Sequence, residues 1–187
     1  MLSSIHPLGE RSRNNRWGVT IAAFTLGSVA AATGIGAALG VIGSFFEPPV
    51  WVLLGVVGLT GFLDLLGVAP PGPERQVNER WIDTYRGTVY GFGFGAQLGA
   101  GLATFVVSWG VFAVLAAELL SGSVAGGAMI GAAFGLGRAA MPLASGWVDR
   151  PSRLTAFHVR LASLARPVHL SSAAVLVGVA ALAAIGA

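Results

Sequence analysis

The stretch that decides the fold is residues 17–46, WGVTIAAFTLGSVAAATGIGAALGVIGSFF. It contains no charged side chain, and apart from the Trp17 indole its polar side chains are all threonine and serine hydroxyls. As a helix it would be roughly 40 Å long or more, which exceeds the hydrocarbon thickness of a bilayer. Glu47, Pro48 and Pro49 follow and end it. We therefore predict a membrane-spanning helix over residues 17–45.

The composition of the whole chain agrees with this interpretation. Of its 187 residues, 55% are hydrophobic and 10% charged, whereas an ordinary soluble domain carries about 25% charged residues. These values exclude a soluble enzyme and a disordered chain, and they predict an all-α integral membrane protein with a single membrane domain. The chain has no cysteine, which excludes disulfides, thiolate metal sites and dithiol redox chemistry by this chain alone.

Four further apolar segments predict spans over residues 50–68, 87–119, 122–143 and 168–187. As one straight helix, residues 87–119 would be about 50 Å long, so this segment must tilt, kink or break. Several glycines between residues 91 and 101 mark the place. Residues 152–166 lie between two prolines and carry leucines and a phenylalanine at helical spacing, with the arginines largely elsewhere. They predict an amphipathic helix on the membrane surface, and a polar connector is the alternative.

The basic residues of the chain are eleven arginines and no lysine. They stand in three places: before the first span, between the second and third spans, and from the end of the fourth span to the start of the fifth. The other two turns carry Glu47 and Glu118 and no arginine. Because arginines favour the cytoplasmic side, five spans place the N-terminus in the cytoplasm and the C-terminus outside. We therefore expect a multi-pass protein of the cell membrane. Because the arginines flank membrane helices, they do not indicate a nucleic-acid-binding surface, and we expect no nucleic acid as a partner.

Few polar groups lie at membrane depth, and these are the candidates for a substrate path. Gln97 stands in the glycine run, and Ser108 follows two to three turns later; Asp64 lies near the cytoplasmic end of the second span. The candidate set is Gln97, Ser108, Asp64, Gly93, Gly95 and Gly99. The alternatives are that Asp64 reaches the interface or pairs with a basic group, and that Gln97 makes an interhelical hydrogen bond.

Other motifs predict packing rather than chemistry. Gly36-x-x-x-Gly40 and Gly127-x-x-x-Gly131 are pairs of small residues that let helices approach closely. They favour packing within the chain, with a homo-oligomer as the alternative. The three histidines show no metal-ligand spacing. We find no nucleotide-binding or catalytic motif, so we expect no cofactor, no metal and no enzyme activity.

The helices resemble a known family. Residues 27–43, GSVAAATGIGAALGVIG, resemble the second helix of the CcdA/DsbD-type transmembrane proteins and their urease-accessory-like and sulfite-exporter-like relatives in the LysE superfamily. Residues 89–120, then GSVAGGA at 122–128, AFGLG at 133–137 and Pro142, resemble the fourth and fifth helices. The resemblance covers roughly residues 17–145 and implies two inverted repeats of three helices.

The chain departs from that family in two respects. The family's proline-cysteine position falls near residues 97–101, where there is no cysteine, so the thiol-relay chemistry does not carry over. The family's first helix is also missing, and we hypothesise that residues 1–5 are the tail of that helix, left by a late start at Met1 or by a real truncation.

Three functions are compatible with these observations. The first is a transporter-like protein that moves a small solute or ion between glycine-rich broken helices, which commonly mark binding sites in transporters. The second is an accessory or scaffold subunit that docks to a membrane-protein partner without transporting anything itself. The third is a cysteine-less role in cytochrome c biogenesis or a thiol relay, with a partner supplying the thiols. The lipid bilayer surrounds the protein in each case.

Overall fold

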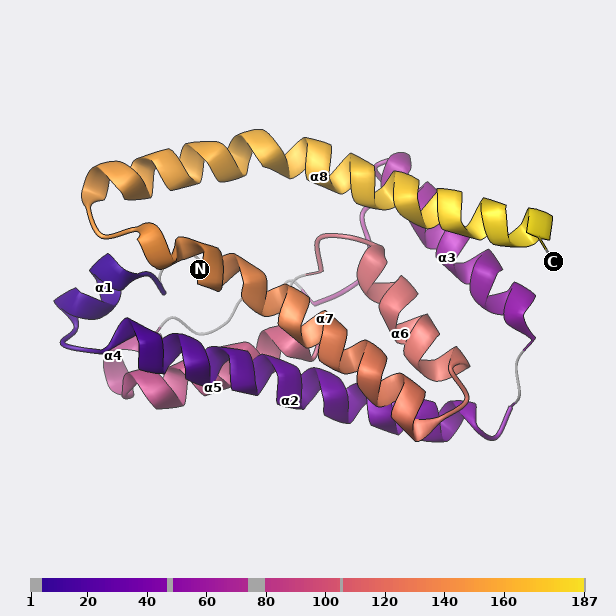
Figure 1. The fold of residues 1–187 in the computed structure, drawn as a ribbon, viewed down its shortest axis with the longest axis horizontal. Helices are drawn as coiled ribbons and strands as arrows, with labels where there is room; N and C mark the ends of the chain where they lie inside the picture. The colour runs from indigo at the N-terminus through magenta and orange to yellow at the C-terminus, as the bar shows by residue number, and fades with distance from the viewer. Residues whose placement is uncertain (1–4, 47–48, 74–79, 105, 187) are drawn as a thin grey trace.

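The computed structural model describes residues 5–46, 49–73, 80–104 and 106–186. This part of the chain is helical and contains no strand (Figure 1), which confirms the predicted all-α class. The helices are α1 (Pro7–Ser12), α2 (Trp17–Gly43), α3 (Val50–Leu65), α4 (Arg80–Thr84), α5 (Gly87–Gly99), α6 (Gly110–Leu120), α7 (Val124–Ala144) and α8 (Pro151–Gly186), with a 3-10 turn, η2 (Ser145–Trp147), after α7.

Three helices are long and apolar enough to cross a membrane. They cover Trp17–Gly43, Val124–Trp147 and Pro151–Ile185. The helices α3 and α6 are apolar but shorter. Large apolar side chains face outward on several helices: Leu26 is 66% exposed, Trp51 69% and Ile185 83%. An apolar exterior of this extent is expected where lipid surrounds a protein, so the structure supports a membrane protein with three candidate spans among the described residues.

Helix α2 packs against both α5 and α7, and it lies along the lower edge of the fold in Figure 1. Glycines at every fourth position of α5 face α2: Gly91 meets Thr20, Gly95 meets Phe24 and Gly99 meets Ser28. Because residue numbers rise together along the two helices, α2 and α5 run parallel.

Helix α7 packs on α2 in the opposite direction. Gly127, Gly131 and Gly135 lie against Gly36, Ala32 and Ser28, respectively. At these contacts a Cβ built on the glycine would overlap a backbone carbonyl oxygen of α2. The small-residue pairs predicted for packing, which include Gly36 and Gly127, therefore meet within one chain and bring two helix backbones into direct contact.

The predicted span over residues 87–119 is broken, as its length required. Helix α5 ends at Gly99 and α6 begins at Gly110, and the described residues between them are not helical. Gly101 has a φ of 73°, in the left-handed region that favours glycine. The chain therefore turns out of the helix at the end of the glycine run, where the sequence predicted an irregularity.

The C-terminal part differs from the prediction. The expected surface helix at 152–166 and the expected span at 168–187 form one continuous helix, α8, with Pro167 in its interior. Proline usually interrupts a helix because it lacks an N–H donor and its ring crowds the carbonyl four residues earlier. Residues 162–168 are all exposed, so the described residues leave this turn largely uncovered, and it can adjust around the ring. The predicted boundary at Pro167 was therefore wrong.

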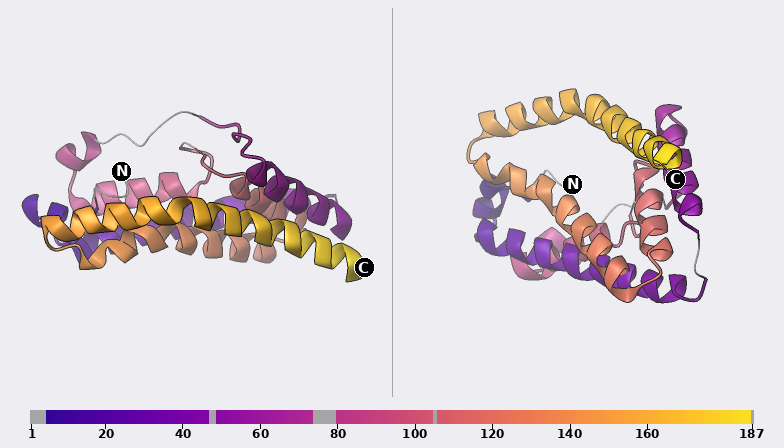
Figure 2. Two further views of the ribbon diagram at one scale, coloured as in Figure 1. Left: turned by 90° about the horizontal axis from the view of Figure 1, so that it is seen from above. Right: turned by 45° about the vertical axis from the view of Figure 1, so that its right-hand side comes forward.

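Helix α8 is held at its two ends. Near its start, the Phe157 ring packs edge-on against Trp147 of η2, with 6.0 Å between ring centroids. Farther on, α8 runs antiparallel to α3 (Figure 2), with Gly61 against Leu176 and Gly58 against Ala180.

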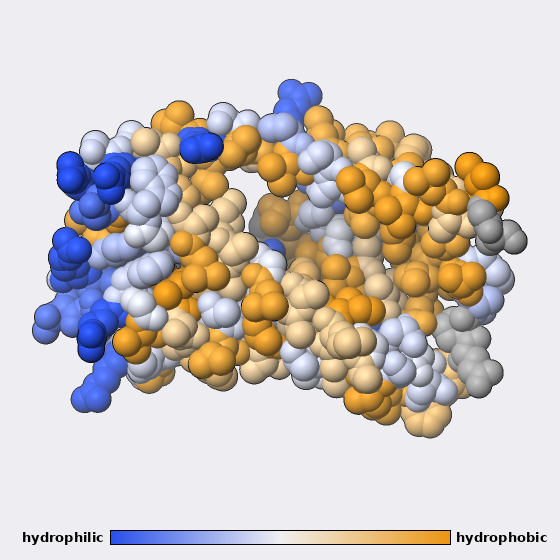
Figure 3. Space-filling view, viewed as in Figure 1, coloured by the Kyte–Doolittle hydropathy of each residue, from blue (hydrophilic) through white to orange (hydrophobic). Residues whose placement is uncertain are grey.

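Hydrophilic residues gather at one end of the molecule. In Figure 3 they occupy the left-hand end, where Figure 1 shows α1, the start of α2 and the start of α8. The C-terminus lies at the opposite end (Figure 1). The chain thus has one strongly polar end and a largely apolar body.

Candidate functional site at the break between α5 and α6

A buried carboxylate occupies the break between α5 and α6. Asp64, in the last turn of α3, is 3% exposed. Its Oδ2 accepts a hydrogen bond from the Ser108 hydroxyl at 2.6 Å, and its Oδ1 accepts from the backbone N–H of Trp109 at 2.8 Å. Trp109 is the N-cap residue of α6. Asp64 therefore caps α6 from another helix, where free N–H groups and the helix dipole favour a negative charge.

Helix α8 completes the cluster with a histidine. His169 Nε2 lies 4.0 Å from Asp64 Oδ1 and 3.3 Å from the Asp64 backbone oxygen. On the other side, the Trp109 indole N–H donates to the backbone oxygen of Val68 at 2.8 Å. Three parts of the chain that are distant in sequence thus converge on one carboxylate, with an imidazole that can carry a proton beside it.

A cavity of about 420 Å³ adjoins this cluster. Its polar groups are the hydroxyls of Ser108, Ser171 and Ser172. The hydroxyls of Ser171 and Ser172 donate to carbonyl oxygens of their own helix, at 3.0 and 2.8 Å, so their lone pairs remain as acceptors. The remaining wall is Gly110, Val168, Val175 and Leu176. A small polar solute or water can therefore reach the Ser108 side of the cluster.

The structure brings together two of the residues that the sequence selected and separates the third. Asp64 and Ser108 are directly bonded. Asp64 also has an imidazole neighbour, with His169 Nε2 at 4.0 Å from Oδ1. Gln97 is half-buried on α5, and its side chain makes no hydrogen bond with the residues that the structure describes.

The three selected glycines have packing roles. Gly93 faces the ring of Trp81, whereas Gly95 and Gly99 contact the backbone of α2. The predicted path between the two glycine-rich segments is therefore filled by backbone contact at Gly95 and Gly99. The candidate site shifts to the break that follows α5.

Two buried carboxylates were missed by sequence reasoning. Glu118 was expected in a turn, but it lies in α6, is 2% exposed, and has no hydrogen-bond partner for Oε2 within the described residues. A Cβ on Gly36 or Gly131 would come within 3.3 or 3.2 Å of its carboxylate, so glycines on α2 and α7 make room for this group. The pairing of Glu118 with these glycines has no local sequence signal.

The second missed carboxylate is Glu10, which is fully buried. It accepts hydrogen bonds from Thr20 at 2.8 Å, from Arg13 at 3.1 Å and from the Tyr90 hydroxyl. This group attaches α1 to α2 and α5. The ion pair between Glu10 and Arg13 could have been predicted, because residues three apart lie on the same face of a helix.

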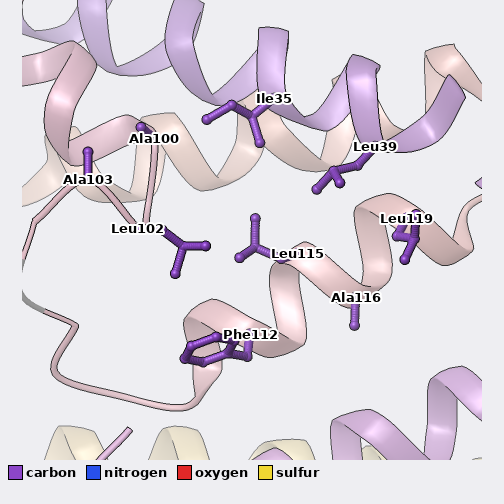
Figure 4. Close-up of a pocket in the computed structure, with 9 residues that line it drawn as sticks. All are labelled: Ile35, Leu39, Ala100, Leu102, Ala103, Phe112, Leu115, Ala116 and Leu119. Atoms are coloured by element: carbon purple, nitrogen blue, oxygen red, sulfur yellow. The ribbon is translucent and has the colours of Figure 1, made fainter. Parts of the chain in front are cut away.

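A further cavity is entirely apolar and lies between α2, α6 and the residues after α5 (Figure 4). Its volume is about 550 Å³. It is lined by Ile35, Leu39, Ala100, Leu102, Ala103, Phe112, Leu115, Ala116 and Leu119. With no polar side chain in its wall, it offers no group for chemistry.

Comparisons of the chain with family models, with curated proteins and with solved structures found no match.

Proposed function

We propose that this chain is a five-span protein of the cell membrane, with its N-terminus in the cytoplasm, that moves a small solute or ion past the Asp64–Ser108–His169 cluster. The alternating course of α2, α3, the pair α5 and α6, α7 and α8 supports five crossings (Figure 1). The polar end, which carries arginines before α2 and at the start of α8, supports the orientation (Figure 3).

One observation carries the proposal: a buried carboxylate beside an imidazole caps a helix that is broken within an apolar body. A carboxylate at such a depth is costly unless it is paired, and ionisable groups there commonly serve transport. Broken helices supply unpaired backbone groups that bind ions and polar solutes. Carboxylates and imidazoles are the side chains that proton relays use, so the proton is the first ion to test.

Proton movement into proteoliposomes tests the proposal directly. A potassium diffusion potential set by valinomycin drives protons inward, and a trapped pH-sensitive dye reports them. We expect the wild-type protein to acidify the lumen faster than empty liposomes, and Asp64→Asn and His169→Gln to remove most of that rate. The matched control is Asp149→Asn, because Asp149 is a carboxylate of the polar end that pairs with Arg153 at 3.0 Å.

Two results would contradict the proposal. The first is a wild-type rate equal to that of empty liposomes. The second is an Asp64→Asn rate equal to that of the wild type.

A second candidate function is an accessory subunit. The observation that favours it is the run of exposed residues at 162–168, which the described residues leave largely uncovered. A photoreactive amino acid in place of Leu164, which is 45% exposed, would crosslink in whole membranes to one stoichiometric protein if this surface is a subunit interface. Crosslinks to lipid alone would reject that role.

A further inference from the structure

A polar cavity lies at the opposite side of the fold from the α3–α8 pair, between the first turns of α2 and α5. Its volume is about 430 Å³. Arg16 stands immediately before α2 and Arg86 immediately before α5, and both line the cavity. The side chains of Asn14, Asn15 and Thr88 add hydrogen-bonding groups. None of these residues belongs to the Asp64 cluster, so this cavity is a separate feature.

The two arginines differ from Arg13 and Arg153 at the same end because neither has an acidic partner among the described residues. Arg13 pairs with Glu10 at 3.1 Å, and Arg153 pairs with Asp149 at 3.0 Å. Arg16 and Arg86 are exposed, and their side chains make no ion pair or hydrogen bond with the described residues. Two arginines from the starts of separate helices therefore line one cavity, and neither forms an ion pair with a described acidic residue.

The carboxylate behind the cavity wall, Glu10, does not neutralise this pair. Thr20 lies in the cavity wall and donates its hydroxyl proton to Glu10 at 2.8 Å. Glu10 is fully buried behind Thr20, and its charge is already matched by Arg13. The lining of the cavity contains two arginines and no acidic residue, so the lining carries an excess of positive charge.

The backbone around the cavity adds to that excess. Because α2 and α5 run parallel, the positive ends of both helix dipoles face the same side. In α2, the carbonyl of the N-cap residue Arg16 accepts hydrogen bonds from the N–H groups of Val19 and Thr20. In α5, the carbonyl of Arg86 accepts from Val89 and Tyr90 in the same way. Neither N-cap has a side-chain hydrogen bond.

The N–H groups of the first helical residues therefore remain free among the described residues. Arginine is a poor residue at these positions, where an oxygen acceptor is preferred. An anion in the cavity would supply that acceptor.

We propose that this cavity binds a phosphate group. Guanidinium groups bind phosphate in a planar, two-point geometry, and the first N–H groups of a helix bind it through the backbone. The Thr88 hydroxyl supplies a further donor. Two sources fit this chemistry: the headgroup of an anionic phospholipid, since the cavity lies where apolar helices meet the polar end, and a free phosphate ion or monoester.

Binding to the purified full-length protein in detergent tests the proposal. Native mass spectrometry measures bound dioleoylphosphatidylglycerol, with dioleoylglycerol as the phosphate-free lipid, and the thermal unfolding temperature is recorded with added inorganic phosphate. We expect saturable binding of phosphatidylglycerol and at least about tenfold weaker binding by Arg16→Gln/Arg86→Gln, because each arginine makes a charge-assisted hydrogen bond. The matched control is Arg160→Gln/Arg166→Gln, which removes the same charge from exposed positions of α8 and should change binding less than about twofold.

The conservative variant Arg16→Lys/Arg86→Lys guards against a folding effect. It keeps both charges and should bind phosphatidylglycerol with intermediate affinity. Stabilisation by inorganic phosphate together with competition against the lipid would identify a free phosphate as a ligand, and lipid binding without competition would identify the headgroup. The proposal is overturned if the wild-type protein binds phosphatidylglycerol no better than dioleoylglycerol and gains no stability from phosphate. It is also overturned if the control double variant loses as much affinity as the test variant.

Discussion

The contact between α2 and α7 at Gly36 allows a sharp test with a neighbouring glycine as the control. A Cβ built on Gly36 would overlap the carbonyl oxygen of Gly127 and lie 3.3 Å from the Glu118 carboxyl carbon, whereas nothing lies within 4 Å of a Cβ on Gly34. Both glycines are interior to the same helix. Replacing either by alanine removes the same backbone freedom, worth about 1 kcal/mol.

The gain in helix propensity is the same for both variants. The difference between their free energies of unfolding therefore measures overpacking alone. The obstacle at Gly36 is backbone, which cannot rotate away as a side chain can, so α2 and α7 must separate. We expect Gly36→Ala to unfold with a free energy about 1–3 kcal/mol below that of Gly34→Ala.

Reversible unfolding in mixed micelles with increasing sodium dodecyl sulfate, followed by circular dichroism, measures this difference. A Gly36→Ala protein that is as stable as Gly34→Ala would refute the backbone contact between α2 and α7.

Three further predictions concern single residues. Glu118→Met should raise the free energy of unfolding by about 1–3 kcal/mol in the same micelle assay, because it removes a buried carboxylate with an unpartnered oxygen; a loss of stability would show that Glu118 has a partner. Pro167→Ala should stabilise the chain by about 1–3 kcal/mol if α8 is continuous, and no gain would favour a break at this residue. Burial, and then the charge of Arg13, lower the pKa of His6 from its usual 6.5, although Glu10 opposes this. The neutral ring accepts from the Gly9 N–H at 3.1 Å; its stabilising contribution should be complete above pH 6.5 and disappear as the pH falls through the lowered pKa. His6→Asn should remove that part of the pH dependence in unfolding curves measured at several pH values.

Several elements could be predicted because their signals are local. The uncharged run at 17–46 predicted α2, and Pro49 stands immediately before α3. The length of the segment 87–119 required an irregularity, and its glycines placed it close to the observed break. These features follow from hydropathy, helix length and backbone conformational preference, which depend on neighbouring residues only.

The prediction at Pro167 failed because a local rule was applied without its surroundings. Proline does disfavour a helix interior, but the cost depends on whether packed neighbours prevent the turn from adjusting. Residues 162–168 are exposed, and the helix continues through them. The exposure of this turn is a property of the assembled fold.

The candidate site shows the same division. Polarity at membrane depth selected Asp64 and Ser108 from the sequence, together with Gln97, which the fold places elsewhere. Nothing local indicated that Asp64 would meet His169 of α8, because the two residues are 105 positions apart. Glu118 was likewise indistinguishable from a turn residue until α2 and α7 enclosed it.

The sequence by itself determined that this chain forms apolar helices suited to a membrane, that one of them breaks, and that its arginines cluster between apolar segments. Only the tertiary structure decided which face of each helix is buried and which distant side chains meet. The first three properties follow from composition and periodicity, because these decide how the side chains and the backbone are solvated. The second depends on the rotation and direction of each helix against its neighbours, and here the glycines of α5 and α7 set both by bringing their backbones against α2.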